Sequence, residues 1–333
     1  MAINLGYACI NVQLGQQGIS CNRGMIKRTF DTKGISYASD LVIENLKDLN
    51  HIINWNAEND FKVYRMSSSI FPWMSEYEIT RMPRFDEIQE LLSMAGSAAL
   101  LKGQRLSFHP GPFNVLGSPT EKNIATTALD LNQHSEIMDL MGLPATNEYA
   151  INIHLGGAYG DKESAMSRFC KNFKKHLSES TKKRLIVEND DKASMFSVSD
   201  LYHGIFQEIG ISITFDYHHH RFCTGGLTEE EAIKLAARTW PEGVRQLTHY
   251  SSCRRTFEEP LGKAQAHADY VYEFIKDYGL ELDIEVESKA KELAIIKYRE
   301  DLTKGTLLTE YLNFDYAGTS RTEDNERIHQ QEF

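Results

Sequence analysis

Seven short apolar runs in this chain lead to a side chain that commonly binds metal ions, most of them at the end of the run. The donor residues are Glu76, His109, His154, Glu188, Asp216 with His219, His249 and Glu287. An eighth strand-like run opens the chain and ends near Tyr7. One histidine after a strand usually has a structural role, but the same pattern repeated along a chain is hard to obtain by chance. Imidazole nitrogens and carboxylate oxygens that converge on one place are typical metal ligands.

The segments between these runs predict how the donors are brought together. Helical periodicity is found at residues 38–56, 85–101, 120–141, 162–177, 197–208, 228–239 and 264–278. The strand-like runs are more often apolar on both faces than alternating, as in a parallel sheet covered by helices. We therefore expect an α/β fold, a single (β/α)₈ TIM barrel with the metal site at the C-terminal mouth of its strands.

Three motifs define the expected centre most closely. His154 lies in IHLGGAYG, where a glycine pair allows close approach of a ligand. Glu188 lies in LIVENDD, and residues 189–191 are placed to cap the loop or orient the ligands. In FDYHHHRF, His218 shares a side with Asp216 in an extended chain, whereas His219 turns inward only if the chain bends after the strand. The spacing alone leaves both histidines open.

The donor set is large enough for two metal ions. A carboxylate such as Glu188 can bridge two cations, and paired ions about 3.5–4 Å apart can clamp both oxygens of a phosphoryl displacement. Mixed nitrogen and oxygen donors favour Mn²⁺ or Zn²⁺ over Mg²⁺. The alternative is a barrel mouth lined by hydrogen-bonded polar residues without a metal.

Composition limits the class of protein. The chain has 333 residues, 41% of them hydrophobic and 25% charged, and a formal net charge of −11. This acidity argues against a generic nucleic-acid-binding protein, although bound cations could supply positive charge at a nuclease site. The five cysteines are scattered, which is typical of reduced thiols in a cytoplasmic protein. We recognise no signal peptide and no apolar run that approaches the ~18 residues of a membrane span.

The C-terminal end differs in character from the rest. Residues 1–302 form the expected barrel domain, and residues 303–333 form a polar extension without a ligand pattern. We expect this extension to be partly docked, up to about Tyr316, and otherwise flexible.

Several motifs together resemble the UV damage endonuclease family. They are YRMSSSIFP, SFHPG, INIHLGGAYG, LIVENDDK, TFDYHHH, HADYV and VESKAKE, and the match runs from Leu5 to about Lys291. The resemblance implies a cluster of two or three divalent ions, with Mn²⁺ expected and Zn²⁺ or Mg²⁺ as alternatives. It also implies cleavage of double-stranded DNA immediately 5′ to cyclobutane dimers and 6-4 photoproducts, leaving a 3′-hydroxyl.

The resemblance also implies residue roles. The metal ligands carried over by motif are His109, His154, Glu188, Asp216, His219, His249 and Glu287, with Glu188, His109 and His154 expected as catalytic. The family spacing favours His219 over His218. Tyr7 matches a family aromatic near the lesion, and Pro112 and Phe113 stand where relatives carry a duplex-probing pair. Apart from the resemblance, Arg254 and Arg255 follow the seventh strand-like run on the loop side of the barrel, where they are expected to contact DNA phosphates.

Three features depart from the family pattern, and one is the pair Pro112 and Phe113, where relatives often carry Gln with Tyr or Phe. Glu76 stands where the family usually has histidine, and Leu247 stands where it often has a lysine near the third ion. A carboxylate at position 76 can still bind a metal, but the occupancy of the third site remains open.

Three other functions are compatible with parts of this pattern. A type IV-like apurinic endonuclease would share the ligands, and a sugar isomerase would need a metal-site lysine and fewer histidines. A lesion-binding barrel without activity would bind DNA and not cut it. In the favoured interpretation the protein acts as a monomer, without a membrane or a nucleotide cofactor.

Overall fold

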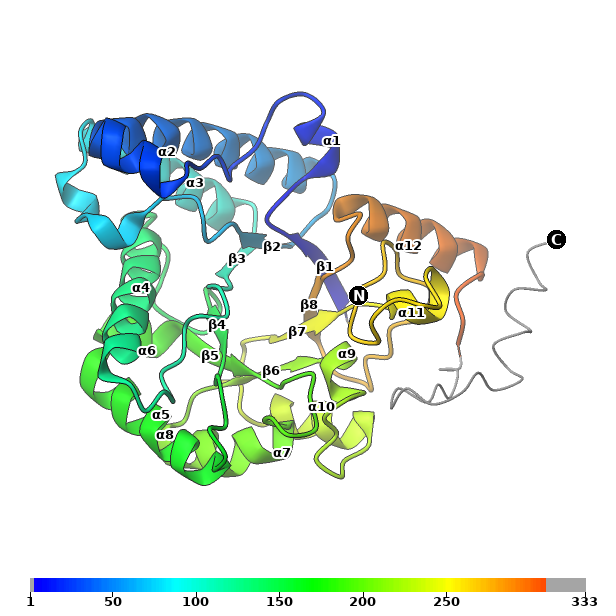
Figure 1. Ribbon diagram of the computed structural model, residues 1–333. Coiled ribbons are helices and arrows are strands. Elements are labelled where there is room, and N and C mark those ends of the chain that lie inside the picture. The colour runs from blue at the N-terminus through cyan, green and yellow to red at the C-terminus, as the bar shows by residue number, and fades with distance from the viewer. Residues whose placement is uncertain (1–2, 310–333) are drawn as a thin grey trace.

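A computed structural model describes residues 3–309, and eight parallel strands in it close into a barrel ringed by helices (Figure 1). The strands pair in sequence order, and the barrel closes between the first and the last. They are β1 (Ile3–Ala8), β2 (Val63–Met66), β3 (Arg105–Phe108), β4 (Ile151–His154), β5 (Leu185–Glu188), β6 (Ile213–Asp216), β7 (Gln246–Tyr250) and β8 (Leu282–Val286). The predicted TIM barrel is confirmed.

The helices follow the predicted alternation, with several changes of boundary. They are α1 (Val12–Gly15), α2 (Lys27–Glu58), η1 (Met74–Glu76), η2 (Ile79–Arg81), α3 (Phe85–Leu101), α4 (Glu121–Leu140), α5 (Lys162–His176), α6 (Glu179–Arg184), α7 (Val198–Leu201), η3 (Tyr202–Phe206), α8 (Gln207–Ile209), α9 (Tyr217–His220), α10 (Glu229–Ala237), α11 (Arg254–Phe257) and α12 (Glu292–Lys304). Ser197 and Thr228 each form a capping box, which explains why α7 and α10 begin where the sequence signals predict.

The predicted helix at residues 264–278 is wrong. This segment has no helical turn, and side chains of neighbouring segments hold its backbone instead. The Glu258 carboxylate accepts hydrogen bonds from the Asp269 and Tyr270 amides at 2.6 and 3.2 Å, and Ser252 Oγ accepts one from Tyr272 at 3.1 Å. These tertiary contacts replace the hydrogen bonds that a helix would have made within the segment.

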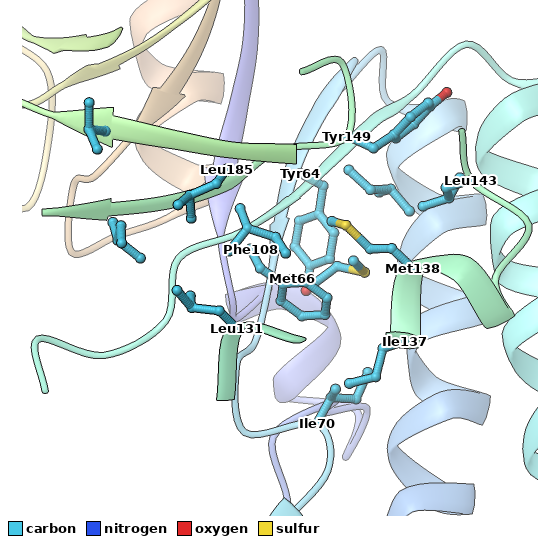
Figure 2. Close-up of a cluster of buried hydrophobic side chains, with 14 of the residues drawn as sticks. Tyr64, Met66, Ile70, Phe108, Leu131, Ile137, Met138, Leu143, Tyr149 and Leu185 are labelled. Carbon is cyan, nitrogen blue, oxygen red and sulfur yellow. The ribbon is translucent and has the colours of Figure 1, made fainter. Parts of the chain in front are cut away.

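The outer surface of the barrel packs against the helices through large apolar side chains. Figure 2 shows Tyr64, Met66 and Phe108 from the strands beside Leu131 and Met138 of α4. These side chains are buried, and they fix the ring of helices around the sheet.

The barrel interior is filled, so chemistry is confined to its mouth. Val63, Ile186 and Leu247 come from non-neighbouring strands and pack together with Trp240. Arg105 and Asp283 form an ion pair of 3.1 Å across the interior, between β3 and β8. A packed interior of this kind is normal for TIM barrels, whose active sites lie at the C-terminal end of the strands.

The segment after the barrel begins close to the expected boundary. α12 ends at Lys304, Leu307 is buried, and Leu308 forms an isolated parallel bridge with Glu273. Residues 306–308 therefore dock on the barrel, and the part of the expected extension from residue 310 onward lies outside the described residues. Among the described helices, none combines the length and apolarity needed to cross a bilayer.

Candidate metal centre

Strand geometry places the expected donors on the inner wall of the barrel mouth. His154, Glu188 and Asp216 are the last residues of β4, β5 and β6. His109 and Glu287 immediately follow β3 and β8. Side chains alternate along a strand, so a donor two residues after a side chain that points into the barrel also points inward.

Glu188 lies at the centre of this group. Its carboxylate, of which 1% is exposed, has His109 Nε2 and His219 Nδ1 at 3.1 Å. His249 Nδ1 lies at 3.2 Å and His154 Nε2 at 3.9 Å. Four imidazole rings thus surround one buried carboxylate.

The donors form two groups that share Glu188. One comprises His109, His154 and Glu188, the other Glu188, Asp216 and His249, and the ligand atoms within each group lie within 4.8 Å of one another. Glu188 Oε1, Asp216 Oδ2 and His249 Nδ1 are buried. Charged neighbours lie 3.1–3.9 Å away, but among the described residues no contact with hydrogen-bond geometry reaches these three atoms. Such atoms are costly in a folded protein unless something else satisfies them. This donor set therefore fits two divalent cations bridged by Glu188.

The electrostatics also fit a site for cations. Burial opposes the charge on Glu188, but the surrounding histidines, His249 first, hold the pKa of its carboxyl well below the usual range. Burial likewise opposes the charged form of His249. The neighbouring carboxylates, Glu188 first, more than offset this effect of burial, so the pKa of the His249 imidazole is raised well above its ordinary value. Glu188 and His249 thus favour each other's charged forms.

The chain selects His219 rather than His218 for the centre. Asp216 caps α9, and its Oδ1 accepts a hydrogen bond from the His219 amide at 2.8 Å, so the chain bends directly after β6. This bend carries His219 to Glu188. His218 is buried away from that carboxylate, and its ring packs against Phe222 and His267.

A second layer of polar residues supports the donors, and the sequence analysis missed most of it. His249 Nε2 lies 3.1 Å from Glu285 Oε2, and Glu285 accepts a hydrogen bond from Ser107 Oγ. Arg65 forms ion pairs with Glu285, at 3.5 Å, and with Glu287. The available signal was spacing, since Glu285 precedes Glu287 by two residues and must face the same side of β8.

Neighbours of Glu188 also orient the ligands. Asn152 Nδ2 donates to Glu188 Oε2, and Asp190 Oδ1 lies 3.1 Å from His154 Nδ1. Asn189 Oδ1 accepts a hydrogen bond from the Asp216 amide at 2.9 Å. The expectation that residues 189–191 orient the ligands thus agrees with the geometry of Asn189 and Asp190. His267, which the sequence analysis did not select, lies 3.8 Å from Glu287.

The structure does not bring Glu76 to this group. Glu76 ends the short helix η1, its side chain is 42% exposed, and it pairs with Lys27 Nζ at 3.2 Å. No ion pair or donor group among residues 3–309 joins it to Glu188. Leu247 is packed in the apolar interior and supplies no donor.

Tyr7 does not fit the expected contact with a lesion. Its side chain is fully buried on the outer face of β1 and packs edge-on against Phe61. Its hydroxyl donates to Asn56 Oδ1 at 2.6 Å and accepts from Asn11 Nδ2 at 2.8 Å. The tyrosine holds α2 against the barrel.

The other expected DNA contacts lie on loops at the mouth. Pro112 is exposed and Phe113 is 89% exposed in the loop after β3. Arg255 is half-buried in α11, and Arg254 already pairs with Glu259 at 3.0 Å and Asp269 at 3.5 Å. Phe113 is therefore the most accessible of these residues.

Comparison with known proteins agrees with this geometry. The family model described as UV-endonuclease UvdE matches residues 3–314. The chain belongs to this family. Membership places it among the DNA-repair endonucleases, and the match covers every strand of the barrel.

Two UvdE relatives illustrate the extent of the similarity. The UV-damage endonuclease of Schizosaccharomyces pombe is 32% identical over 303 residues, which are 88% of this chain and 49% of the relative. The chain therefore spans about half the length of that protein. The UV DNA damage endonuclease of Bacillus mycoides is 35% identical over 273 residues, 78% of this chain and 80% of the relative.

Solved structures support the same fold. The crystal structure of SacUVDE aligns with a TM-score of 0.78 and 28% identity, covering 92% of this chain and all of the other (100%). Endonuclease IV from Thermus thermophilus aligns with a TM-score of 0.54 at 11% identity, covering 90% and 99%. At that identity the second similarity concerns the fold alone.

Proposed function

We propose that this protein is a divalent-metal-dependent endonuclease that nicks double-stranded DNA immediately 5′ to UV photoproducts, leaving a 3′-hydroxyl. The observation that carries the proposal is Glu188, a buried carboxylate shared by two groups of metal-type donors at the barrel mouth. Family membership supplies the substrate class, since the relatives are named for endonuclease action on UV-damaged DNA.

Each donor has a distinct part in this proposal. His109 and His154 would hold one ion and Asp216 and His249 the other, and the Glu188 carboxylate belongs to both groups. Mixed nitrogen and oxygen donors favour Mn²⁺ or Zn²⁺ over Mg²⁺, and the family resemblance favours Mn²⁺. When bound, divalent cations lower the pKa of water and neutralise charge that develops on phosphate.

The exposure of the donors indicates the side from which DNA approaches. The His154 and His109 side chains are 26% and 18% exposed, whereas those of His249 and Asp216 are 0% and 1% exposed. The phosphodiester therefore reaches the His109–His154 side first. Phe113, in the loop that follows His109, lies on the same rim and can stack on a base of the everted lesion.

The test is nicking of an end-labelled duplex that carries one defined photoproduct. Mn²⁺ is added in one reaction and EDTA in another, beside a duplex with an abasic site and an undamaged duplex. We expect a Mn²⁺-dependent cut at the phosphate 5′ to the photoproduct and an intact undamaged duplex. Cutting only at the abasic site would transfer the protein to the apurinic class. A folded, metal-loaded protein that binds the photoproduct and cuts neither substrate would be a lesion-binding barrel.

A further inference from the structure

The loop that follows β7 carries an apolar side chain where a soluble protein normally places a polar one. Leu261 is 96% exposed, the largest exposed fraction among the described large hydrophobic residues. It stands at the third position of a tight turn from Glu259 to Gly262, closed by a 2.7 Å hydrogen bond from the Gly262 amide to the Glu259 carbonyl. Pro260 fits the second position of such a turn, but the third usually has Asp, Asn, Ser or Gly.

This turn is the tip of a hairpin-like loop, residues 253–267, which contains α11. Cys253 and His267 form an antiparallel bridge at its base, and the Arg254 amide donates to the Ala266 carbonyl at 2.8 Å. Cys253 Sγ donates to the Ala264 carbonyl at 3.1 Å, and the Arg254 side chain pairs with Glu259 next to the turn. Hydrogen bonds and an ion pair therefore connect the tip to the base of the loop.

The base of the hairpin lies beside the metal centre. Cys253 follows the C-terminal end of β7, and His267 Nδ1 lies 3.8 Å from Glu287. The Lys289 amide, from the segment after β8, donates to the Ala268 carbonyl at 3.0 Å. The hairpin thus starts and ends at the barrel mouth.

The hairpin stands opposite the loop that carries Phe113. In this closed barrel of eight strands, β3 and β7 lie four strands apart in both directions around the ring. Phe113 follows β3 and Leu261 follows β7, so two exposed apolar side chains flank the metal centre from opposite rims.

We propose that Leu261 is a second DNA wedge, which packs into the unstacked duplex on the opposite side of the lesion from Phe113. This inference rests on the proposed function. Proteins that kink DNA insert Leu and Phe side chains between base steps, and the bent duplex then contacts more of the protein surface. Lys263, exposed beside the turn, and Arg255 at the hairpin base supply positive charge for the backbone of the same strand.

The first measurement compares nicking of the photoproduct duplex by the wild type, Leu261→Ser and Leu101→Ser. Leu101 is a matched control, because it is 88% exposed but lies at the end of α3 that precedes β3, on the opposite end of the barrel. We expect Leu261→Ser to lower kcat/KM about tenfold, as the loss of one buried leucine contact implies. Leu101→Ser should match the wild type.

The second measurement does not require cleavage. In a Glu188→Gln background, 2-aminopurine is placed on one or the other side of the photoproduct, and its fluorescence reports unstacking on binding. We expect Leu261→Ser to abolish the signal at one position and Phe113→Ser to abolish it at the other. If Leu261→Ser changes neither reporter, or nicks as fast as the wild type, Leu261 is not a wedge. A different outcome would separate the two proposals. If Leu261→Ser abolishes the fluorescence signal at its position but the wild type does not nick the duplex, Leu261 is a wedge and the protein is not a nuclease.

Discussion

Nε2 of His249 lies 3.1 Å from Oε2 of Glu285, on the opposite edge of the ring from Glu188. Glu285 is itself held by Ser107 and Arg65, so the orientation of one candidate ligand is fixed by a chain of buried polar contacts. Carboxylates that hold the second nitrogen of a ligand histidine set its tautomer and raise its basicity.

Glu285→Gln should therefore weaken metal binding without removing a ligand. The amide keeps the size of the carboxyl group beside His249 Nε2, but the charge that favours a strongly basic imidazole is lost. We expect the affinity for Mn²⁺ to fall about 10–100-fold, measured by titration calorimetry on metal-free protein. Glu281→Gln is the control, because Glu281 directly precedes β8 but its side chain is 77% exposed. Equal affinity for both variants would show that Glu285 has no influence on the ligand.

The shared position of Glu188 predicts a particular metal stoichiometry. The wild type should bind about two ions per chain. His109→Ala should lose one of them and Asp216→Ala the other, whereas Glu188→Ala should lose both. Equilibrium dialysis against Mn²⁺ with elemental analysis measures this directly. In Glu188→Ala the nicking rate should fall at least about a hundredfold. This loss exceeds the one expected for a residue that only orients a metal ligand. A Glu188→Ala protein that retains both ions would rule out the bridging arrangement.

Tyr7 gives a test that separates a structural role from a DNA contact. Its hydroxyl bonds Asn56 and Asn11 in a buried setting. Tyr7→Phe should lower the free energy of unfolding by about 1–2 kcal/mol, because both partners lose a hydrogen bond. The kcat/KM for the photoproduct duplex should stay unchanged. Urea unfolding and the nicking assay measure the two effects. A large loss of kcat/KM at unchanged stability would instead indicate that Tyr7 contacts DNA.

The sequence predicted the barrel and the convergence of most expected donors at its mouth, because both depend on a simple geometric repeat. Each strand must bury both faces and end at the same mouth, so a donor at the strand end is recognisable without knowledge of the tertiary structure. His154, Glu188 and Asp216 follow this rule directly. The choice between His218 and His219 required the bend at α9, which spacing did not determine.

The three failures have separate causes. Glu76 ends the short helix η1, and residues 67–75 separate it from β2, so the strand does not fix its direction. Tyr7 lies within β1, but its side chain alternates to the helix side. Residues 264–278 have a helical apolar pattern, and contacts from Glu258 and Ser252 override it. Propensity cannot anticipate such distant contacts.

His134 allows a prediction about stability in acid. The residue lies in α4, its ring packs edge-on against Phe108 at 4.9 Å, and its Nδ1 lies 2.8 Å from the Asp130 carbonyl oxygen. Nε2 is buried without a hydrogen-bond partner among the described residues. Burial lowers the pKa of this imidazole below its ordinary value of 6.5, although the Asp130 charge opposes the shift.

A lowered pKa in the folded state means that the unfolded chain binds the proton more readily. The stability that His134 contributes is therefore complete above pH 6.5 and is lost as the pH falls through the lowered pKa of the folded state. In His134→Gln, the free energy of unfolding should decrease less between pH 8 and pH 5 than in the wild type, as urea unfolding at each pH would show. His51→Gln, at an exposed position of α2, should retain the wild-type dependence. Parallel curves for His134→Gln and the wild type would mean that a different group causes the acid instability.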